Sequence, residues 1–385
     1  MPDLADVVIV GGGLLGAALA AELSRRTLRV ILLEAHALAG AASGNGFAWV
    51  NATAKLDREP YHHLNALGLA HYDMLAAEWG VERIGLHGGG ALFWAEGEEE
   101  AGRAQLRQRA ARLQAWDYPV ALLSQAEMQT LEPQALFGEG AEGLFAPADR
   151  WVDTPRLVRF CAERARERGA EIREYCPALG FTRSVVGTIS TVETPQGRIS
   201  TRLLVLAAGV QTPSLVAQVT GDPAGSSRIP VQRVPGLLVE TPPGSAPGQA
   251  QRVLYPPEKG GLHLRPTPGG GLLLGADDTD AALNDPDASY PPEAPAGLLA
   301  RAARFLPGLP VEPLQDALAA RVCVRPVPGD GLPIVGPLPG VDGVFIAVTH
   351  SGVTLGPLLA HYLAEEMVSG RIWPLLTPYR PARFL

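Results

Sequence analysis

Lysine is almost missing from this chain of 385 residues. Of its 32 basic residues only Lys55 and Lys259 are lysines, and all the others are arginines. We interpret this bias as a consequence of genome composition rather than of function. The formal net charge is -8, whereas a domain that binds nucleic acid carries a surplus of positive charge. The composition therefore excludes nucleic acid as a partner.

Cysteine is also scarce and follows no recognisable pattern. Cys161, Cys176 and Cys323 are odd in number and have none of the spacings of a metal site. The histidines of segment 59–79 are not accompanied by carboxylate or cysteine partners in a metal-ligand pattern. We therefore predict a reducing compartment, no disulfide framework and no bound metal.

A long hydrophobic segment is lacking as well. Residues 7–23 are mostly apolar, but they fall short of the ~20 residues that span a bilayer and are rich in glycine. They follow the acidic segment 1–6, whereas a signal peptide begins with a basic one. We therefore predict no transmembrane segment and a cytoplasmic protein.

The most informative stretch that is present lies at the N-terminus. An apolar run of strand type at 7–10 leads into Gly11, Gly13 and Gly16 in the order G-x-G-x-x-G, and a second apolar run ends at Glu34. The first glycine makes a tight turn, the second lets the backbone approach a pyrophosphate, and the third lets the helix pack on the strand. The acid can accept hydrogen bonds from a ribose. This context predicts dinucleotide binding, and the alternative is a glycine-rich turn in another α/β protein.

The length of the chain predicts two domains. Proline and glycine are dense between 221 and 318, and the apolar runs there are short, which is typical of an antiparallel sheet joined by turns. Strand-ending glycine segments return at 322–335 and 343–348. We predict an α/β fold with a discontinuous Rossmann-type nucleotide-binding domain and a second domain built on a mostly antiparallel β-sheet plus helices. The predicted boundaries are 1–79, 143–220 and 319–385 for the first domain, and 80–142 and 221–318 for the second.

Helices and strands are predicted from caps, periodicity and turn residues. A glycine- and alanine-rich loop is expected at 39–47. The predicted helices are 59–79, 97–116, 154–169 and 354–370. The predicted strands include 170–175, 178–182, 188–193, 198–206, 236–240, 261–264, 271–275 and 320–324.

Five motifs follow one another along the chain. They are Val-Gly-Gly-Gly-Leu-Leu-Gly at 10–16 with Glu34, Ala-Ser-Gly-Asn-Gly at 42–46, Val-Leu-Ala-Ala-Gly at 205–209, Arg-Pro at 325–326 with Asp-Gly-Leu-Pro-Ile-Val-Gly at 330–336, and His-Ser-Gly-Val-Thr-Leu at 350–355. In these motifs, over its whole length, the chain resembles the flavoprotein amine and amino-acid oxidoreductases typified by glycine oxidase, D-amino-acid oxidase and monomeric sarcosine oxidase. The resemblance implies bound FAD rather than NAD, and a catalytic face where the flavin meets the sheet of the second domain.

The resemblance also implies which residues bind FAD. The loop at 43–46 runs along the flavin, Ala178 and the turn at 208–209 touch the adenine side, and the start of the last helix lies at the pyrimidine end. A helix N-terminus there would stabilise negative charge on the reduced flavin. The last motif is two residues shorter than is common in the family, so a tighter loop is expected. The predicted cofactor-binding residues are Gly11, Gly13, Leu14, Leu15, Gly16, Glu34, Ala35, Ser43, Gly44, Asn45, Gly46, Ala178, Ala208, Gly209, Asp330, Gly352, Val353, Thr354 and Leu355.

Arg325 is the residue that the resemblance assigns to a substrate carboxylate. A planar guanidinium binds a carboxylate through two parallel hydrogen bonds and fixes its orientation; an ordinary salt bridge is the alternative. His263, on the predicted strand 261–264, is the second candidate catalytic residue, and a surface histidine beside a turn is the alternative. Arg58 and Arg265 are the next candidates for the carboxylate.

Two further positions bear on the cofactor and on the electron acceptor. Cys323 aligns with a cysteine that holds the flavin covalently in monomeric sarcosine oxidase, but its neighbours differ, and we interpret it as a buried packing residue. Leu273 stands at the position of a lysine that promotes the reaction with oxygen in sarcosine oxidase-like members. Without that cation, the reduction of O₂ gains no local charge stabilisation. This slightly favours a dehydrogenase over an oxidase.

The sequence thus predicts an FAD-dependent oxidoreductase that oxidises a small amino acid or N-substituted amino acid to the imine. Two alternatives stay open: an FAD-dependent dehydrogenase of a 2-hydroxy acid or another small substrate such as a glycerol phosphate, and an FAD-binding electron-transfer subunit of a larger complex. The expected partners are the amino-acid substrate and an electron acceptor, either oxygen or another compound. A homo-oligomer is possible.

Overall fold

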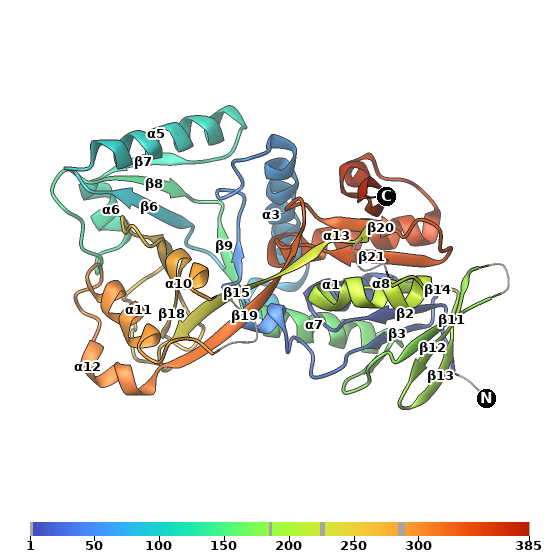
Figure 1. Ribbon diagram of the computed structural model, residues 1–385. Coiled ribbons are helices and arrows are strands. Elements are labelled where there is room, and N and C mark those ends of the chain that lie inside the picture. Colours follow the sequence, from blue (N-terminus) through green and yellow to red (C-terminus); the bar gives the residue numbers. More distant parts are fainter. Residues whose placement is uncertain (1–2, 185–186, 224–227, 284–288, 385) are drawn as a thin grey trace.

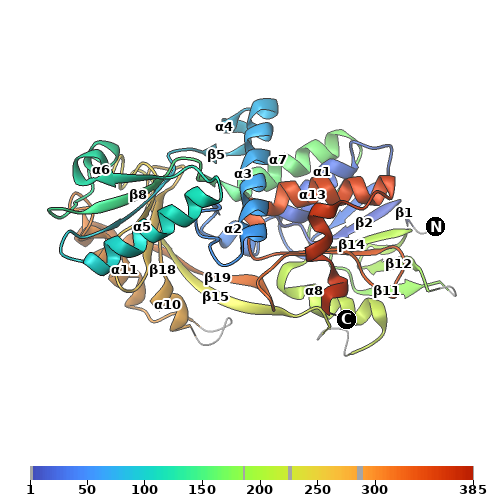
Figure 2. The ribbon, with the colours of Figure 1, turned by 90° about the horizontal axis from the view of Figure 1, so that it is seen from above.

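A computed structural model describes residues 3–184, 187–223, 228–283 and 289–384. Two bodies of secondary structure lie side by side, one around a six-stranded sheet and the other around an eight-stranded sheet (Figure 1). The long paired strands β15 (Val231–Glu240) and β19 (Ala319–Pro328) run from the eight-stranded sheet toward the other body (Figure 1 and Figure 2).

The six-stranded sheet has the strand order β10-β3-β2-β14-β21-β20. Its first five strands are parallel, and β20 pairs antiparallel with β21. Every residue of β2 and β3 is buried, as expected for parallel strands covered on both faces. The strands are β2 (Val7–Val10), β3 (Val30–Leu33), β10 (Glu171–Arg173), β14 (Leu203–Leu206), β20 (Ile334–Pro337) and β21 (Val344–Val348).

Helices cover one face of this sheet, and a small sheet with one helix covers the other. Successive strand residues point to opposite faces, so Val7 and Ile9 pack among the helices while Val8 and Val10 pack under the small sheet. The helices of the first face are α1 (Leu14–Leu23), α7 (Thr154–Glu167) and α13 (Gly352–Ser369), with α3 (Glu59–Trp79) beside α13. The opposite face carries α8 (Thr212–Thr220) and the strands β1 (Asp3–Leu4), β11 (Gly180–Arg183), β12 (Ile189–Thr194) and β13 (Gly197–Ser200).

The eight-stranded sheet has the strand order β19-β15-β18-β17-β16-β6-β8-β7. All its pairs are antiparallel except β16 with β6. Its other strands are β6 (Ala91–Ala95), β7 (Ala121–Ser124), β8 (Glu142–Ala146), β16 (Val253–Tyr255), β17 (Leu262–Pro266) and β18 (Leu272–Ala276).

The two faces of the eight-stranded sheet differ in chemistry. One face is the apolar core of this body, where Leu237, Leu264 and Leu274 pack with Leu298 of α11 (Ala294–Ala303). The other face is covered by α5 (Glu100–Ala115) at one end and carries polar side chains over β17 to β19. The polar face therefore carries the side chains that could bind a substrate or take part in a reaction.

Short elements complete the chain. A three-stranded sheet has the strand order β4-β9-β5. These elements are α2 (Ala42–Asn45), β4 (Trp49–Val50), α4 (Val81–Ile84), β5 (Leu86–His87), α6 (Gln125–Leu131), β9 (Arg150–Val152), η1 (Gly209–Gln211), α10 (Asp277–Ala281), α12 (Val311–Leu314), η2 (Gln315–Ala317), η3 (Pro374–Tyr379) and η4 (Pro381–Phe384).

The sequence interpretation differs from the structure in several places. The strand predicted at 236–240 is the second half of β15, and the strand predicted at 198–206 is divided into β13 and β14. The loop predicted at 39–47 contains the short helix α2. The side-chain amide of Asn45, its last residue, donates to the carbonyls of Gly40 and Ala41 and so stabilises this turn. The strand predicted at 320–324 is β19, which continues through Arg325 to Pro328 because β15 pairs with it along its whole length. The last helix begins at Gly352 rather than at 354. The domain boundaries stay a prediction, although β8 and β19 both hydrogen-bond within the eight-stranded sheet.

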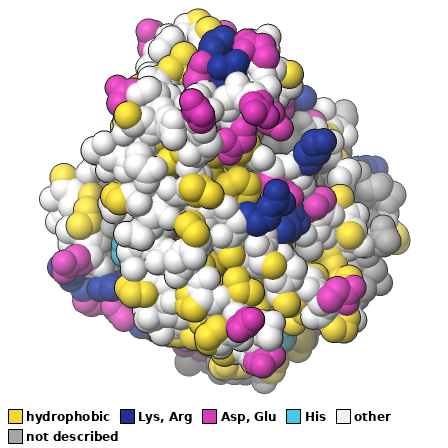
Figure 3. Space-filling view, turned by 90° about the vertical axis from the view of Figure 1, so that its left-hand side faces the viewer, with side chains coloured by type: hydrophobic (Ala, Val, Ile, Leu, Met, Phe, Trp, Pro, Cys, Tyr) yellow, Lys and Arg dark blue, Asp and Glu magenta, His cyan; other side chains and the backbone are white. Residues whose placement is uncertain are grey.

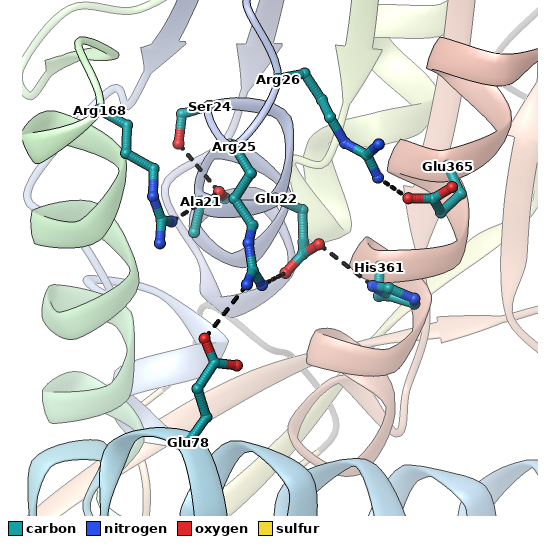
Figure 4. Close-up of polar contacts among 9 residues, drawn as sticks. All are labelled: Ala21, Glu22, Ser24, Arg25, Arg26, Glu78, Arg168, His361 and Glu365. Carbon is teal, nitrogen blue, oxygen red and sulfur yellow. Dashed lines mark hydrogen bonds and ion pairs between the residues drawn. The ribbon is translucent and has the colours of Figure 1, made fainter.

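A network of charged side chains lies where α1 ends (Figure 4). Glu22 of α1 pairs with Arg25 at 3.4 Å and lies 3.3 Å from Nδ1 of His361 on α13. Arg25 also pairs with Glu78 of α3 at 3.3 Å. Pairs as exposed as these contribute about 0–1 kcal/mol, so apolar packing rather than charge holds these helices together.

The end of the molecule that carries α5 has a mixed surface (Figure 3). Acidic and basic side chains are interspersed at the top of this view, and hydrophobic side chains are scattered across its middle. In the part of the chain that the structure describes, no helix is both long and apolar enough to cross a membrane.

Candidate active site

The glycine loop after β2 has the geometry that a dinucleotide needs. Gly11 has a φ of +116°, and a Cβ there would lie 2.4 Å from the carbonyl oxygen of Ala207. A Cβ on Gly16 would lie 2.0 Å from the carbonyl oxygen of Gly11. Both positions therefore require glycine, one for the turn and the other for the close packing of α1 on that turn.

The loop at 42–46 meets the N-terminus of α1. Ser43 Oγ accepts a hydrogen bond from the Leu14 N–H at 3.0 Å, and a Cβ on Gly13 would lie 2.9 Å from that oxygen. The α1 N-cap residue makes no side-chain capping bond of its own. Two predicted cofactor segments, 11–16 and 43–46, thus come together at a helix N-terminus, which favours phosphate.

Glu34 ends β3 beside the same loop. Its carboxylate accepts hydrogen bonds from the N–H groups of Gly12, at 2.6 Å, and of His36, at 2.9 Å. The predicted neighbour Ala35 is exposed, and Ala178 is half-buried in the segment that follows Cys176, whose N–H donates to the Glu34 carbonyl at 2.8 Å. The ribose-binding role of Glu34 stays a prediction, and the carboxylate is held where that role would need it.

The turn at 208–209 lies at the point where the strand order reverses. Strand β2 lies between β3, which follows it in the chain, and β14, which comes much later. Ala208 and Gly209 lie just after β14, which ends at Leu206, and Gly209 has a φ of +53°. Ligands of open α/β sheets bind outside the carboxyl ends of the strands at such a reversal.

The start of α13 provides a second helix N-terminus at the site. Ser351, its N-cap residue, makes no side-chain capping bond, and a Cβ on Gly352 would meet no atom within 4 Å. Thr354 Oγ1 accepts from the Asn51 N–H at 3.2 Å, and the Val353 carbonyl accepts from the Tyr72 hydroxyl at 2.7 Å. The helix start is therefore fixed by its neighbours and open in front, while Leu355 is fully buried behind it.

These segments fit FAD. The glycine cradle, the N–H groups at the two helix starts and the carboxylate of Glu34 supply the donors and the acceptor that its pyrophosphate, flavin and ribose require. Asp330 is placed differently: Arg383 binds both oxygens of its carboxylate, at 2.8 and 3.0 Å. A cofactor contact through Asp330 stays a prediction that this arrangement does not support.

The register of the eight-stranded sheet brings the predicted substrate residues to one face. Arg325 opposes Val234 and Cys323 opposes Gly236 across β19 and β15. Arg265 opposes Leu273 and His263 opposes Gly275 across β17 and β18. Because partners in adjacent strands share a face, Arg325, Cys323, Leu273, Arg265 and His263 lie on the same side, opposite the apolar core.

Arg325 lies in an ion pair. Its Nη2 donates to the Pro235 carbonyl at 2.8 Å and lies 2.9 Å from Oδ2 of Asp280, a residue of α10. The other oxygen of Asp280 accepts from the Leu237 N–H at 2.8 Å. The Nε of Arg325 is buried without a partner, and the side chain is 34% exposed. The guanidinium is thus fixed on one side and open to a ligand on the other.

Two glycines make room for the polar groups on this face. A Cβ on Gly236 would lie 3.0 Å from Cζ of Arg325 and 2.9 Å from Oδ2 of Asp280. A Cβ on Gly275 would lie 2.6 Å from Nε2 of His263. The guanidinium, the carboxylate and the imidazole therefore lie flat over glycines of neighbouring strands, where a larger residue would push them apart.

His263 is buried, which favours the neutral form of its imidazole. Burial lowers its pKa, which the carboxylates of Asp277 and Asp280 raise and Arg325 lowers again. Its Nδ1 lies 2.9 Å from the Gly261 carbonyl, which can only accept, so Nδ1 carries the proton and Nε2 has a free lone pair. Tyr255 stacks on the ring at 5.4 Å between centroids. The surface alternative for His263 is therefore excluded.

The structure also shows the surroundings of the other residues that the sequence singled out. Cys323 is buried, and burial raises the pKa of its thiol to about 11, which opposes the thiolate that a flavin link requires. Leu273 is fully buried. Arg265 donates to the carbonyls of Phe47 and Pro266, and burial lowers its pKa to about 9. Arg58 is exposed just before α3.

Sequence reasoning missed two charged residues of the site. Asp280 is one of three acids that directly follow β18, and only the folding of α10 shows which of them meets Arg325. Lys55 stood out only as a rarity of composition. Although His350 is exposed, the protein atoms around it and the cations Lys55 and Arg325 together lower its pKa to about 4. The scarcity of lysine in the chain could have been the signal for Lys55.

A cavity of about 460 Å³ lies away from these groups, between α5 and the turn after β16. Arg109, Lys259 and Trp94 are among its lining residues, and neither Arg325 nor His263 is. The converging polar groups, rather than this cavity, mark the candidate active site.

Known proteins resemble the whole chain. A family model described as DAO, FAD dependent oxidoreductase, matches residues 6–366. Glycine oxidase of Geobacillus kaustophilus (strain HTA426) is 29% identical over 369 residues, which cover 94% of this chain and 92% of that protein. Glycine oxidase of Bacillus licheniformis is 26% identical over 381 residues, with 95% and 94% covered.

Solved structures give the same result for the fold. The crystal structure of glycine oxidase from Geobacillus kaustophilus matches with a TM-score of 0.81 at 26% sequence identity, and 99% of each chain is covered. The predicted fold class is thereby confirmed.

Proposed function

Because the chain belongs to the family of FAD-dependent oxidoreductases, whose model matches residues 6–366, we propose that it oxidises a small amino acid or N-substituted amino acid to the imine. FAD is its cofactor, as the resemblance predicted. The proposed substrates are glycine, sarcosine, a D-amino acid or a proline-like amino acid, and the imine then hydrolyses in water. The glycine oxidases among the relatives support an amine-bearing substrate.

The observation that carries the proposal is the state of Arg325. It is an arginine on the polar face of the sheet, fixed through Nη2, and 34% of its side chain is exposed to an approaching ligand. A carboxylate bound there would have its orientation set by the planar guanidinium. The neutral ring of His263 would lie beside the amine and present the lone pair of Nε2.

The cofactor would be held by the residues that meet at the switch point. The N–H groups at the start of α1 would receive the pyrophosphate, Glu34 the ribose, and the start of α13 the pyrimidine end of the flavin. When bound, FAD supplies the acceptor for the hydride that leaves the carbon beside the amine. The protein contributes orientation and the exclusion of water.

We also propose that the physiological electron acceptor is not oxygen. Leu273 is a fully buried aliphatic residue on the face where the flavin would lie. It provides no positive charge for the superoxide that forms first when O₂ takes an electron.

An anaerobic substrate screen tests the proposed function. The purified protein is mixed without oxygen with glycine, sarcosine, D-alanine and D-proline, and the visible absorbance of the flavin is followed. We expect at least one of them to bleach the flavin. If lactate or glycerol 3-phosphate bleaches it and no amino acid does, the substrate class is wrong. A flavin that none of these compounds reduces would favour an electron-transfer role within a larger complex.

A further inference from the structure

We propose that Asp280 binds the amine of the substrate, so that Asp280 and Arg325 together recognise an amino acid through both of its charged ends. This inference rests on the proposed function and names a specificity-determining residue for it. The two side chains come from different elements, α10 and β19, and meet with 2.9 Å between Nη2 and Oδ2.

The geometry of Asp280 leaves one oxygen for a ligand. Its Oδ1 accepts from the backbone N–H of Leu237 at 2.8 Å, which anchors the carboxylate to β15. Its Oδ2 faces Arg325 and lies over Gly236, where no side chain intervenes. The side chain is 13% exposed. An ionised carboxylate accepts several hydrogen bonds, so Oδ2 can receive an N–H of the substrate in addition to its contact with Arg325.

Asp280 also competes with any carboxylate that approaches Arg325. A guanidinium offers two forks for a carboxylate, one through Nη1 and Nη2 and the other through Nε and Nη2, and both include Nη2. Asp280 and Pro235 already engage that nitrogen. A ligand that carries only a carboxylate must therefore displace Asp280 or lie beside its negative charge. A ligand that also carries an ammonium group gains a partner from the same oxygen.

This arrangement predicts opposite effects of one substitution on two classes of ligand. In Asp280→Asn the amide oxygen can still accept from Leu237, but the negative charge is lost. Binding of acetate, which has no amine, should tighten several-fold because the competitor of Arg325 is weakened. The kcat/KM for the amino-acid substrate should fall ~10- to 100-fold, the equivalent of one charge-assisted hydrogen bond.

The experiment measures both ligands on the FAD-loaded protein. The dissociation constant of acetate is read from the shift that it causes in the flavin spectrum, and kcat/KM is measured for the amino acid that bleaches the flavin best. Asp278→Asn is the matched control, because Asp278 lies on the same helix but is exposed and pairs with Arg301 at 3.0 Å. It should change neither value. Asp280→Glu, which restores the charge, should recover part of the kcat/KM.

Each other outcome overturns the inference. If both ligands improve in Asp280→Asn, Asp280 is only a competitor of the substrate carboxylate. If both become worse, it only positions Arg325, and if neither changes it contacts no ligand. The melting temperature and the FAD content of the variants identify a folding defect, and Asp280→Glu then carries the test. Failure of the proposed function looks different, because no amino acid would then reduce the flavin of the wild-type protein.

Discussion

Arg325 is the residue whose substitution separates substrate binding from cofactor binding. Arg325→Ala should leave FAD bound and lower kcat/KM for a carboxylate substrate roughly 30- to several-thousand-fold. The loss of a charge-assisted bidentate pair in a partly desolvated site costs on the order of 2–5 kcal/mol. Arg325→Lys should recover only part, since a point charge does not reproduce the planar fork. Steady-state kinetics and the flavin spectrum measure the two effects.

Arg321→Ala is the control for this variant. Arg321 lies on the same strand and the same face, but its Nη1 is paired with Glu240 at 2.9 Å. We expect its kcat/KM to stay within about threefold of wild type, which is under 1 kcal/mol. If Arg325→Ala also stays within that range, the carboxylate is bound elsewhere, and Arg265 on β17, which lies on the same face of the sheet, is the next candidate.

The electron acceptor depends on the charges near Leu273. The substrate-reduced flavin should reoxidise slowly in air and quickly with a phenazine dye, because the leucine offers no charge to a developing superoxide. Hydrogen peroxide formed as fast as the substrate is consumed would refute this proposal. Should Lys55→Met then abolish peroxide formation, Lys55 would be the cation that Leu273 does not provide.

The sequence predicted the site residues that lie in strands but missed those that lie outside them, and the reason is physical. Arg325, His263 and Leu273 lie in strands, where a period of two and an antiparallel register fix which residues share a face. Asp280 and Lys55 lie outside strands, and where their side chains reach depends on turns that no sequence period encodes. The ion pair of Asp280 with Arg325 is visible only in the folded chain.

At the scale of elements, the start of α13 depends on a close contact with α3. A Cβ on Gly68 of α3 would lie 2.6 Å from the carbonyl oxygen of Thr354. Gly68→Ala should push α3 away from the first turn of α13 and lower both the stability and the affinity for FAD. Overpacking costs ~1–3 kcal/mol, which exceeds the ~1 kcal/mol that alanine gains over glycine in a helix.

Gly297→Ala is the matched control for that contact. Gly297 lies in α11, and a Cβ there would meet no atom within 4 Å. This substitution should leave FAD binding unchanged and stabilise the fold by up to ~1 kcal/mol. Urea unfolding and FAD titration of the two variants give the comparison. Equal effects in both would mean that α3 and α13 do not need the close approach.

The elements themselves were predictable to different degrees. Helices α3 and α7 were found from their periodicity and caps, and β11 and β12 were found as the strands predicted at 178–182 and 188–193. The strand predicted at 198–206 is divided into β13 and β14. The extent of β19 was not, because its last residues are held by pairing with β15 rather than by their own propensity. The helix α2 was missed because its four residues include Gly44 and are held by local hydrogen bonds.

At the scale of the whole molecule, one buried acid should make stability fall with pH. Asp149 is fully buried and accepts from the Thr53 and Tyr118 hydroxyls at 2.8 and 2.5 Å. Burial raises its pKa to about 7 although these hydrogen bonds lower it. The folded state therefore binds this proton more tightly than the unfolded state. Its contribution to stability is complete below the unfolded pKa and is lost as the pH rises through about 7.

Asp149→Asn isolates this effect, because the amide resembles the protonated acid. Wild type should lose a few kcal/mol of unfolding free energy between about pH 5 and pH 8, and the variant should lose less. Burial also raises the pKa of Glu132 to about 7, so the unfolding free energy of both proteins keeps part of its dependence on pH. Urea unfolding at saturating FAD measures the difference. Parallel pH profiles would show that Asp149 is ionised in the folded protein.

The account as a whole claims that bound FAD is reduced by an amino acid held through its carboxylate. The most direct measurement compares, without oxygen, the rate at which an amino acid bleaches the flavin with the rate for the same amine lacking the carboxylate, such as D-alanine and ethylamine. The account predicts bleaching by the amino acid at least ~30 times faster, since the amine loses the contact with Arg325. Equal rates for the two compounds, or reduction by neither class, would contradict it.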